Sequence, residues 1–278
     1  MPLRPLAAAV AVLTLAASLL AAAASPAVAS GPRRLELTYE IYYGGFLSGS
    51  LDVTVDATEG RYQMASRLRS RGAIDMLIRF TASSESQGVL SAGRVAPRRY
   101  RTDNTWMGEA RRVRSTYRPD GGVEAVAVPS AAEDDREEIP PAAARGSVDP
   151  LSAAFALARS AGAGAACTTE VRVFDGWRLY DLRLAYGGEE RLTGDRYTGP
   201  ARRCRVTFTR LGGRSQRPWL PRSVRPSTAE LWFAPVAEGL PPVPVRLETE
   251  VAFATLVAHL VAARATGPTR SEAAAAIH

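Results

Sequence analysis

Apolar and polar residues alternate along much of the chain after Arg34, which is the pattern of β-strands that bury one face. The first such segment places these side chains on one face: Leu35, Leu37, Tyr39, Ile41 and Tyr43. Gly44-Gly45 interrupts the segment, and the alternation resumes over 51–55 and 62–68. Because parallel strands would need long crossover connections, these closely spaced segments predict an antiparallel meander.

The second half of the chain repeats this pattern around a strong turn signal. Strand-like segments cover 170–174 and 177–185, and they flank Asp175-Gly176. An Asp-Gly pair supplies the positive φ angles that a tight turn needs, so we expect a β-hairpin here. Further alternating segments cover 201–210 and 243–253.

One segment predicts a helix with clear ends. Asp149 can cap this helix, and Pro150 suits its first position. Apolar residues continue at helical spacing over 151–159, and Gly162 is typical of a residue that ends a helix. Residues 72–79 lack alternation, and we expect them to form either a short helix or a bent connection.

The pattern determines three further segments less well. Residues 129–147 are polar, acidic and contain proline, which is typical of a mobile surface loop. Residues 231–233 form a short apolar segment near prolines, which predicts an edge strand. Residues 256–263 fit either an extension of the preceding strand or a terminal helix. Alternation also leaves open whether the interior is a filled core or a cavity.

The composition is that of a globular protein. The chain has 278 residues, of which 46% are hydrophobic and 23% are charged, so it is long enough to bury a sizeable core. Every basic residue is Arg, and the formal net charge is +7. The chain has only two Cys and two His, and this small inventory excludes most metal-centred and nucleophilic chemistry.

Residues 1–29 have the three parts of a secretory signal peptide. A single arginine precedes a stretch of apolar and small residues over 6–24, and an A-x-A cleavage site follows over 27–29. An uncleaved membrane anchor is the alternative, but a stretch made mostly of Ala gains little from lipid. We therefore expect cleavage and export, with a single β-rich domain over 30–264 and a disordered tail over 265–278.

Export changes the interpretation of the two cysteines. Cys167 and Cys204 are the only pair in the sequence, and an oxidising compartment favours a bond between them. A redox-active pair would have C-x-x-C spacing, which is absent. We therefore predict a structural disulfide, and the chain-entropy relation assigns it about 4 kcal/mol of stabilisation.

Several phrases of the sequence resemble the family called domain of unknown function 3108, whose members are exported periplasmic proteins. The phrases are Y-E-I-x-x-G-G over 39–45 followed by Gly49, D-P-L-S over 149–152, and V-F-D-G-x-R-x-Y-D-L over 173–182 between Cys167 and Cys204. The likeness covers residues 34–263. Position 177 departs from the pattern, because it is Trp where a basic residue is expected.

The resemblance implies a mainly β fold. Members of the family resemble the half-barrel of lipoprotein carrier and sorting proteins, in which a curved antiparallel sheet and one main helix surround an apolar cavity. The resemblance also implies a periplasmic location. It carries no established function, and no catalytic residue can be transferred from it.

Candidate catalytic and metal-binding residues are few. Nucleophilic hydrolysis needs a base beside the nucleophile, and only His259 and His278 are available. His259 lies among apolar residues, which is typical of a packed histidine, and zinc would need a Cys and His cluster that the sequence lacks. We expect no metal, no cofactor and no catalytic residue. A carboxylate-based hydrolase stays a remote alternative, because paired carboxylates meet only in the fold.

Arginines cluster on predicted strands, and four of them are candidates for contact with an anionic surface: Arg98, Arg99, Arg112 and Arg114. Such a face would attract anionic lipid headgroups by about 1 kcal/mol for each charge close to a membrane. The alternative is that exposed Arg only keeps an antiparallel sheet soluble. Nucleic-acid binding is not expected, since aromatic residues do not interleave with the arginines.

The sequence thus favours non-catalytic binding of an apolar or lipid-like ligand in the cell envelope. The candidate lining residues are Tyr39, Ile41, Leu51, Val53, Leu68, Phe208 and Val245. The alternative for each of them is an ordinary core position. The alternative function is an envelope module that contacts another protein or, peripherally, the membrane surface.

Overall fold

The structure is a computed structural model that describes residues 33–266 apart from short gaps, which are 59, 78, 92–93, 163–166, 195, 217–226 and 237–239. The predicted signal peptide over 1–29 lies outside the described residues, as does the predicted tail beyond Thr266. Ala265 and Thr266 were expected in that tail, but they end the last strand because they pair with Leu35 and Arg34.

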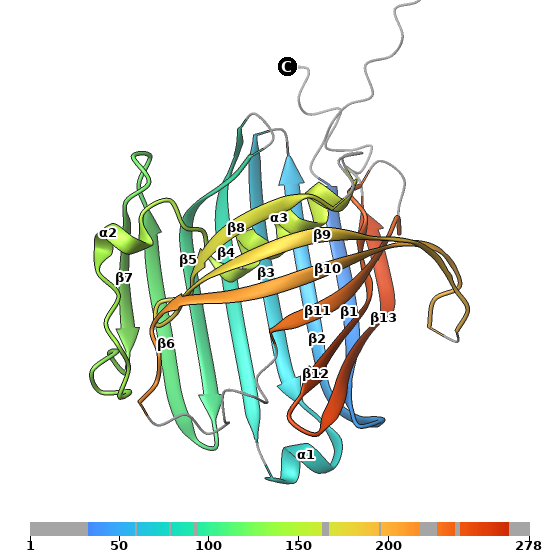
Figure 1. Cartoon of the computed structure of the whole chain (residues 1–278), viewed down its shortest axis with the longest axis horizontal. Helices are drawn as coiled ribbons and strands as arrows, with labels where there is room; N and C mark the ends of the chain where they lie inside the picture. Colours follow the sequence, from blue (N-terminus) through green and yellow to red (C-terminus); the bar gives the residue numbers. More distant parts are fainter. Residues whose placement is uncertain are drawn as a thin grey trace, which may run out of the picture.

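One antiparallel sheet makes up most of the described residues (Figure 1). Its thirteen strands, in chain order, are β1 (Arg33–Tyr43), β2 (Phe46–Thr58), β3 (Arg61–Ser70), β4 (Phe80–Ser91), β5 (Arg94–Trp106), β6 (Glu109–Tyr117), β7 (Val123–Val128), β8 (Thr169–Phe174), β9 (Leu179–Leu192), β10 (Gly199–Gly212), β11 (Thr228–Ala234), β12 (Val243–Val251) and β13 (Ala254–Thr266). The prediction of a mainly β protein with an antiparallel sheet is confirmed.

The strand order shows how two meanders become one sheet. The order is β7-β6-β5-β4-β3-β2-β1-β13-β12-β11-β10-β9-β8. Within each half of the chain, every strand therefore pairs with the strands that precede and follow it in the sequence. The first and last strands then pair with each other, with Leu35 opposite Ala265. The sheet is not closed into a barrel, and its two edge strands are β7 and β8.

The sheet curls so that its two ends overlap. Figure 1 shows β8–β11 crossing in front of the first meander, with the main helix between the two layers. The β8–β9 turn packs directly on β6, since a Cβ atom at Gly176 would lie 2.6 Å from a methyl group of Val113. The Trp177 indole N–H also donates to the carbonyl of Pro129, 2.9 Å away. The concave face therefore becomes the interior of the molecule.

Three helices occur among the described residues: α1 (Gly72–Leu77), α2 (Pro141–Ala144) and α3 (Pro150–Gly162). The main helix is α3, and its bounds agree with the predicted cap and stop. The backbone N–H of Ser152 donates to Oδ1 of Asp149 at 2.9 Å, as expected of a capping carboxylate. Of the two alternatives for 72–79, the structure has the short helix.

The structure corrects two expectations for local structure and decides between the alternatives for a third segment. The segment 129–147 is not simply a surface loop, because α2 lies within it and Ala144 is buried in the core. The strand that contains 231–233 is internal, not at an edge, since β11 pairs with β10 on one side and β12 on the other. Residues 256–263 are extended, and they belong to β13.

Candidate ligand cavity

An apolar cavity of about 700 Å³ lies in the concavity between α3 and the strands that join the two meanders. Its lining comes from β1–β4, α3, β11–β13 and the segment before β12: Leu35, Leu37, Tyr39, Leu51, Val53, Val55, Ala57, Thr58, Gly60, Met64, Leu90, Ala154, Phe155, Ala158, Arg159, Leu231, Leu240, Pro241, Pro242, Val243, Pro244, Leu247 and Ala258. Cavities of this size and polarity hold small ligands in many proteins.

The local sequence explains why this space stays open. The inward residues of β1 and β2 alternate with outward polar ones, so a continuous apolar wall forms. The helix faces this wall with small side chains, because Ala154 and Ala158 both line the cavity. Phe155 reaches the sheet, and its ring centroid lies 5.4 Å from that of Tyr62. The helix is thus anchored beside the cavity without filling it.

The predicted lining residues divide into two groups. Tyr39, Leu51 and Val53 line the cavity, as the alternation of β1 and β2 predicted. The other four are not among the described lining residues: Ile41, Leu68, Phe208 and Val245.

Those four residues lie elsewhere in the interior. Ile41 and Leu68 are partly buried on the first meander. The ring of Phe208 packs on Tyr180 with a centroid distance of 4.6 Å. Val245 is only 1% exposed, and it borders a separate pocket together with Leu192 and His259. Alternation identified the inward face of each strand, but it could not tell where along that face the space remains empty.

Sequence reasoning missed several lining residues. Leu35, Leu37 and Met64 lie on predicted alternating segments, so the signal for them was present. The contributions of α3 and of residues 240–244 depend on how distant segments meet, and no local pattern indicates them.

Arg159 is the only charged residue among the described lining residues. Its Nε atom is buried and has no hydrogen-bond partner. The centre of its guanidinium group lies 5.9 Å from the ring centroid of Phe155, one turn earlier on the same face of α3. The described part of the chain gives this side chain no ion pair.

A buried polar cluster lies at the start of α3. Ser86 Oγ donates to Oδ2 of Asp149 at 2.8 Å, and Ser152 Oγ donates to the same oxygen at 2.5 Å. The Tyr62 hydroxyl lies 2.6 Å from Ser152 Oγ. Asp149 is fully buried, and this burial raises the pKa of its carboxyl more than the hydrogen bonds lower it. The cluster joins α3 to β3 and β4.

Asp175 is the second buried carboxylate, and its partners are those of a turn. Its Oδ1 accepts hydrogen bonds from the backbone N–H groups of Trp177 and Arg178, at 3.0 and 2.7 Å. Its Oδ2 accepts one from Nε of Arg178 at 2.6 Å. Neither Asp149 nor Asp175 is among the residues that line the cavity. Both carboxylates instead hold backbone geometry.

Cys167 and Cys204 form the predicted disulfide. Their Cα atoms are 5.9 Å apart, which is within the range of bonded cysteines, and both residues are fully buried. The bond fixes the segment that follows α3 to β10 in the second meander. It lies in a core cluster with Leu157 and Leu184, on the side of α3 away from the first meander.

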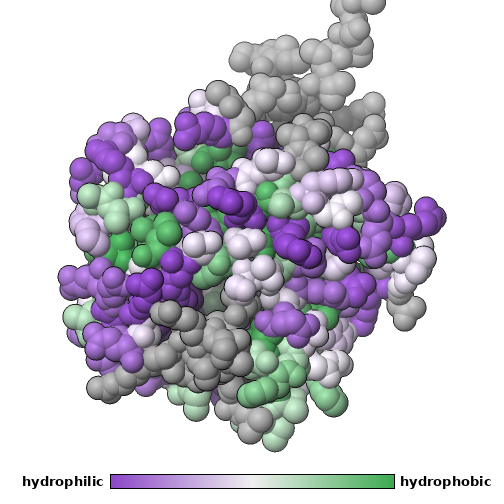
Figure 2. Space-filling view, in the orientation of Figure 1, coloured by the Kyte–Doolittle hydropathy of each residue, from purple (hydrophilic) through white to green (hydrophobic). Residues whose placement is uncertain are grey.

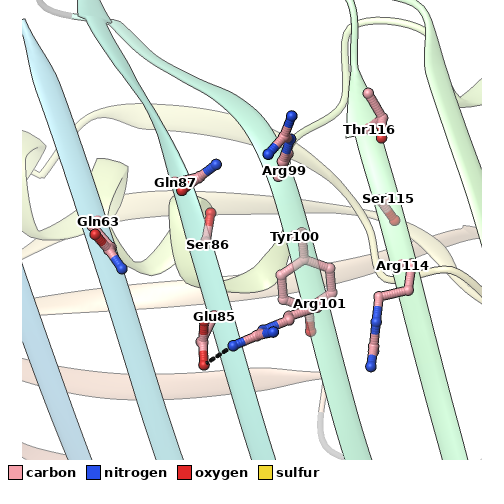
Figure 3. Close-up of a pocket in the computed structure, with 10 residues that line it drawn as sticks. All are labelled: Gln63, Glu85, Ser86, Gln87, Arg99, Tyr100, Arg101, Arg114, Ser115 and Thr116. Atoms are coloured by element: carbon pink, nitrogen blue, oxygen red, sulfur yellow. Dashed lines mark hydrogen bonds and ion pairs between the residues drawn. The ribbon is translucent and has the colours of Figure 1, made fainter.

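The arginine face lies on the outer surface of β3–β6. Figure 3 shows Arg99, Arg101 and Arg114 in a shallow depression there, with the ion pair between Arg101 and Glu85 drawn as a dashed line. Arg114 pairs with Asp103, with Nη2 and Oδ2 3.0 Å apart.

The two other arginines predicted for this face, Arg98 and Arg112, are exposed. Acidic side chains alternate with basic ones across this surface, so it carries both signs of charge. Contact of these arginines with an anionic surface stays a prediction.

Four exposed apolar side chains lie in α1 or where strands turn at one end of the sheet, and we call them the apolar rim: Phe46, Met76, Met107 and Phe253. Backbone hydrogen bonds join neighbouring turns of this rim: Gly44 N to Thr255 O, Arg71 N to Ser48 O, and Met107 N to Arg79 O. Figure 2 shows hydrophobic residues gathered at the lower end of the visible face, where Figure 1 places α1. Exposed apolar side chains at one end of a molecule are candidates for a contact surface.

Two kinds of feature, a cluster of metal ligands and a membrane-spanning helix, are absent from the described residues. Within them, no three His, Cys, Asp or Glu side chains are grouped so that they could hold a metal ion. None of the described helices has the length and apolar character needed to cross a bilayer. His259 lies on β13 with its ring 6.0 Å from that of Tyr42, and burial lowers its pKa. His278 lies outside the described residues.

Comparison with known proteins agrees with this architecture. A crystal structure described as a beta-barrel-like protein of domain of unknown function DUF1849 from Brucella abortus is similar with a TM-score of 0.50 at 10% identity. The match covers 84% of this chain and 97% of that one. At this identity it establishes a similar fold and carries no information about function. None of the curated proteins matches the chain. The family model described as "Protein of unknown function (DUF3108)" matches residues 38–261. The chain therefore belongs to the DUF3108 family.

Proposed function

We propose that this protein binds an apolar or lipid-like ligand in its cavity without catalysing a reaction. The observation that carries the proposal is an apolar space of about 700 Å³ in the concavity of the sheet. Each methylene group moved from water into such a space contributes about 0.8 kcal/mol, so a single alkyl chain would supply useful affinity. The two buried carboxylates support a non-catalytic role, because their partners are serines, a turn and an arginine.

We also propose that the protein acts after export, in the periplasm. A buried disulfide supports this location, since such bonds persist in oxidising compartments. Cell fractionation and mass spectrometry of the purified protein test it. The expected mature N-terminus is Ser30, and recovery of the intact chain from the cytoplasm would refute the proposal.

A cavity-filling variant tests ligand binding. Ala158→Phe places a ring in the cavity, so it should abolish binding of 1-dodecanol measured by calorimetry. Ala156→Phe is the matched control, because Ala156 lies on the same helix but is not among the lining residues. Circular dichroism establishes whether each variant is folded. Equal binding by the wild type and by folded Ala158→Phe would contradict the proposal, as would the absence of binding by the wild type.

The apolar rim favours a second candidate function, which is contact with a membrane surface. Exposed rings and thioethers lie in α1 and at separate strand turns, and the exposed Arg71 and Arg79 flank α1. Apolar side chains that enter the headgroup region and arginines that attract anionic lipids are the usual components of such a contact.

Vesicle sedimentation tests this second candidate. The protein should sediment with anionic phospholipid vesicles, and a Phe46→Ser/Phe253→Ser variant should not. Val126→Ser is the control, because Val126 is an exposed apolar residue on the edge strand β7, outside the rim. Sedimentation that is unchanged in the double variant would exclude the rim as the contact surface.

A further inference from the structure

We propose that the ligand of the cavity is an anionic amphiphile with a single alkyl chain, whose headgroup is bound by the guanidinium of Arg159. This inference rests on the proposed function, and it adds the class of the headgroup. The shared chemistry is a carboxylate or phosphate group at the end of an alkyl chain.

The first observation is the unsatisfied nitrogen of Arg159. Its Nε is buried without a hydrogen-bond partner, and burial of an unpaired donor on a charged group is costly. Nearly all buried polar atoms in folded proteins have a partner, so an exception in a ligand cavity indicates what the ligand supplies. An anionic oxygen is the strongest partner for this N–H.

Two structural roles for Arg159 do not satisfy this nitrogen. Its position in the last turn of α3 suits a cation, because the helix dipole is negative there. However, a terminal carbonyl of α3, that of Ala161, already accepts a hydrogen bond from Nη1 of Arg202 at 2.5 Å. The contact of Arg159 with the ring of Phe155 is a cation–π contact, and Nε still has no hydrogen-bond partner.

The charge of the lining residues favours a headgroup with a negative charge. Arg159 carries the only charge among the described lining residues, and no carboxylate among them would bind a cationic group. A neutral hydroxyl could accept one hydrogen bond, but it would leave the charge of the guanidinium without a counterion. Carboxylate and phosphate oxygens match the planar guanidinium in two parallel hydrogen bonds. The apolar remainder of the lining suits the alkyl chain.

Calorimetry with four amphiphiles of one chain length tests the inference. The probes are 1-dodecanol, dodecanoate, monododecyl phosphate and dodecylamine, each used below its micelle concentration at about pH 8. We expect at least one anionic probe to bind about tenfold more tightly than dodecanol, since a charged hydrogen bond contributes about 1.5–3 kcal/mol. Dodecylamine should bind more weakly than dodecanol. The affinities of the two anionic probes relative to each other distinguish a carboxylate ligand from a phosphate ligand.

Variants of the arginine separate charge recognition from stability. Arg159→Gln should weaken binding of the anionic probes more than binding of dodecanol and so remove the preference for them, while Arg159→Lys should keep part of the preference. Arg112→Gln is the matched control, because it removes the same charge from the outer face of β6 and should change nothing.

The outcomes distinguish failure of this inference from failure of the proposed function. Equal affinity of the wild type for dodecanol and both anionic probes would overturn the inference and leave the proposed function intact. An anionic preference that persists in Arg159→Gln would also overturn it. If no probe binds, including dodecanol, both the inference and the proposed function fail.

Discussion

Asp149 combines two functions in one side chain, since it caps α3 and joins the helix to the sheet. Its carboxylate accepts hydrogen bonds from Ser86, from the Ser152 hydroxyl and from the Ser152 backbone. The cap follows from the local Asp-Pro sequence, and it was predicted. The bond to Ser86 joins residues 63 positions apart, and local sequence contains no signal for it.

The buried carboxyl of Asp149 predicts a pH dependence of stability. Burial raises its pKa above the ordinary value of 3.8, so the folded state binds a proton more tightly than the unfolded state. Its contribution to stability is greatest below about pH 4, and it is lost as the pH rises through the folded pKa. The Asp149→Asn variant removes this titration.

Urea unfolding of both proteins between about pH 4 and pH 8 measures this effect. The free energy of unfolding of the wild type, relative to that of Asp149→Asn, should decrease as the pH rises. A difference that stays constant across this range, or that increases with pH, would show that the pKa of this carboxyl is not raised.

Gly176 gives a second prediction for a single residue. It adopts φ of +99°, and a Cβ atom there would lie 2.6 Å from Val113. Gly176→Ala should therefore destabilise the protein by about 1–3 kcal/mol from overpacking, in addition to the backbone strain. Gly108→Ala is the control, because Gly108 has φ of +90° but no atom within 4 Å of the added Cβ. Equal losses of stability in the two variants would exclude the clash with Val113.

At the scale of elements, most strands could be predicted because one face of each strand is buried and the other is polar. The helix α3 and the β8–β9 hairpin were also predictable, since their ends carry Asp-Pro, Gly and Asp-Gly signals. The prediction for β11 was wrong, because short length and nearby proline describe a segment but do not determine its neighbours. The choice between helix and strand for residues 256–263 could not be made from the sequence, because small apolar residues suit both.

The disulfide is the covalent connection between elements, and its removal should have a measurable cost. It closes a loop of 37 residues, from the segment after α3 to β10. The double variant Cys167→Ser/Cys204→Ser should lose about 4 kcal/mol of stability, because the unfolded chain regains the freedom of that loop. Urea unfolding of the variant and of the oxidised wild type measures the loss. A midpoint that does not change would show that the bond contributes no stability.

At the scale of the whole molecule, the fold is one sheet that curls around a helix. The cavity remains where small side chains of α3 face the inner surface of the sheet. Alternation and the family resemblance predicted the curved sheet and three of the lining residues. They could not predict the position of the empty space, because it depends on the packing of α3 and of residues 240–244 against β1 and β2. Arg159 was missed for the same reason.

The most direct test of the central claim is native mass spectrometry of the protein purified from the cell envelope without detergent. The account predicts a bound species of constant added mass in the wild type and in Ala156→Phe, released on unfolding as an apolar or lipid-like molecule. In folded Ala158→Phe, the account predicts only the mass of the chain. A wild-type protein that carries no added mass, and that takes up no 1-dodecanol when this is supplied, would contradict the account.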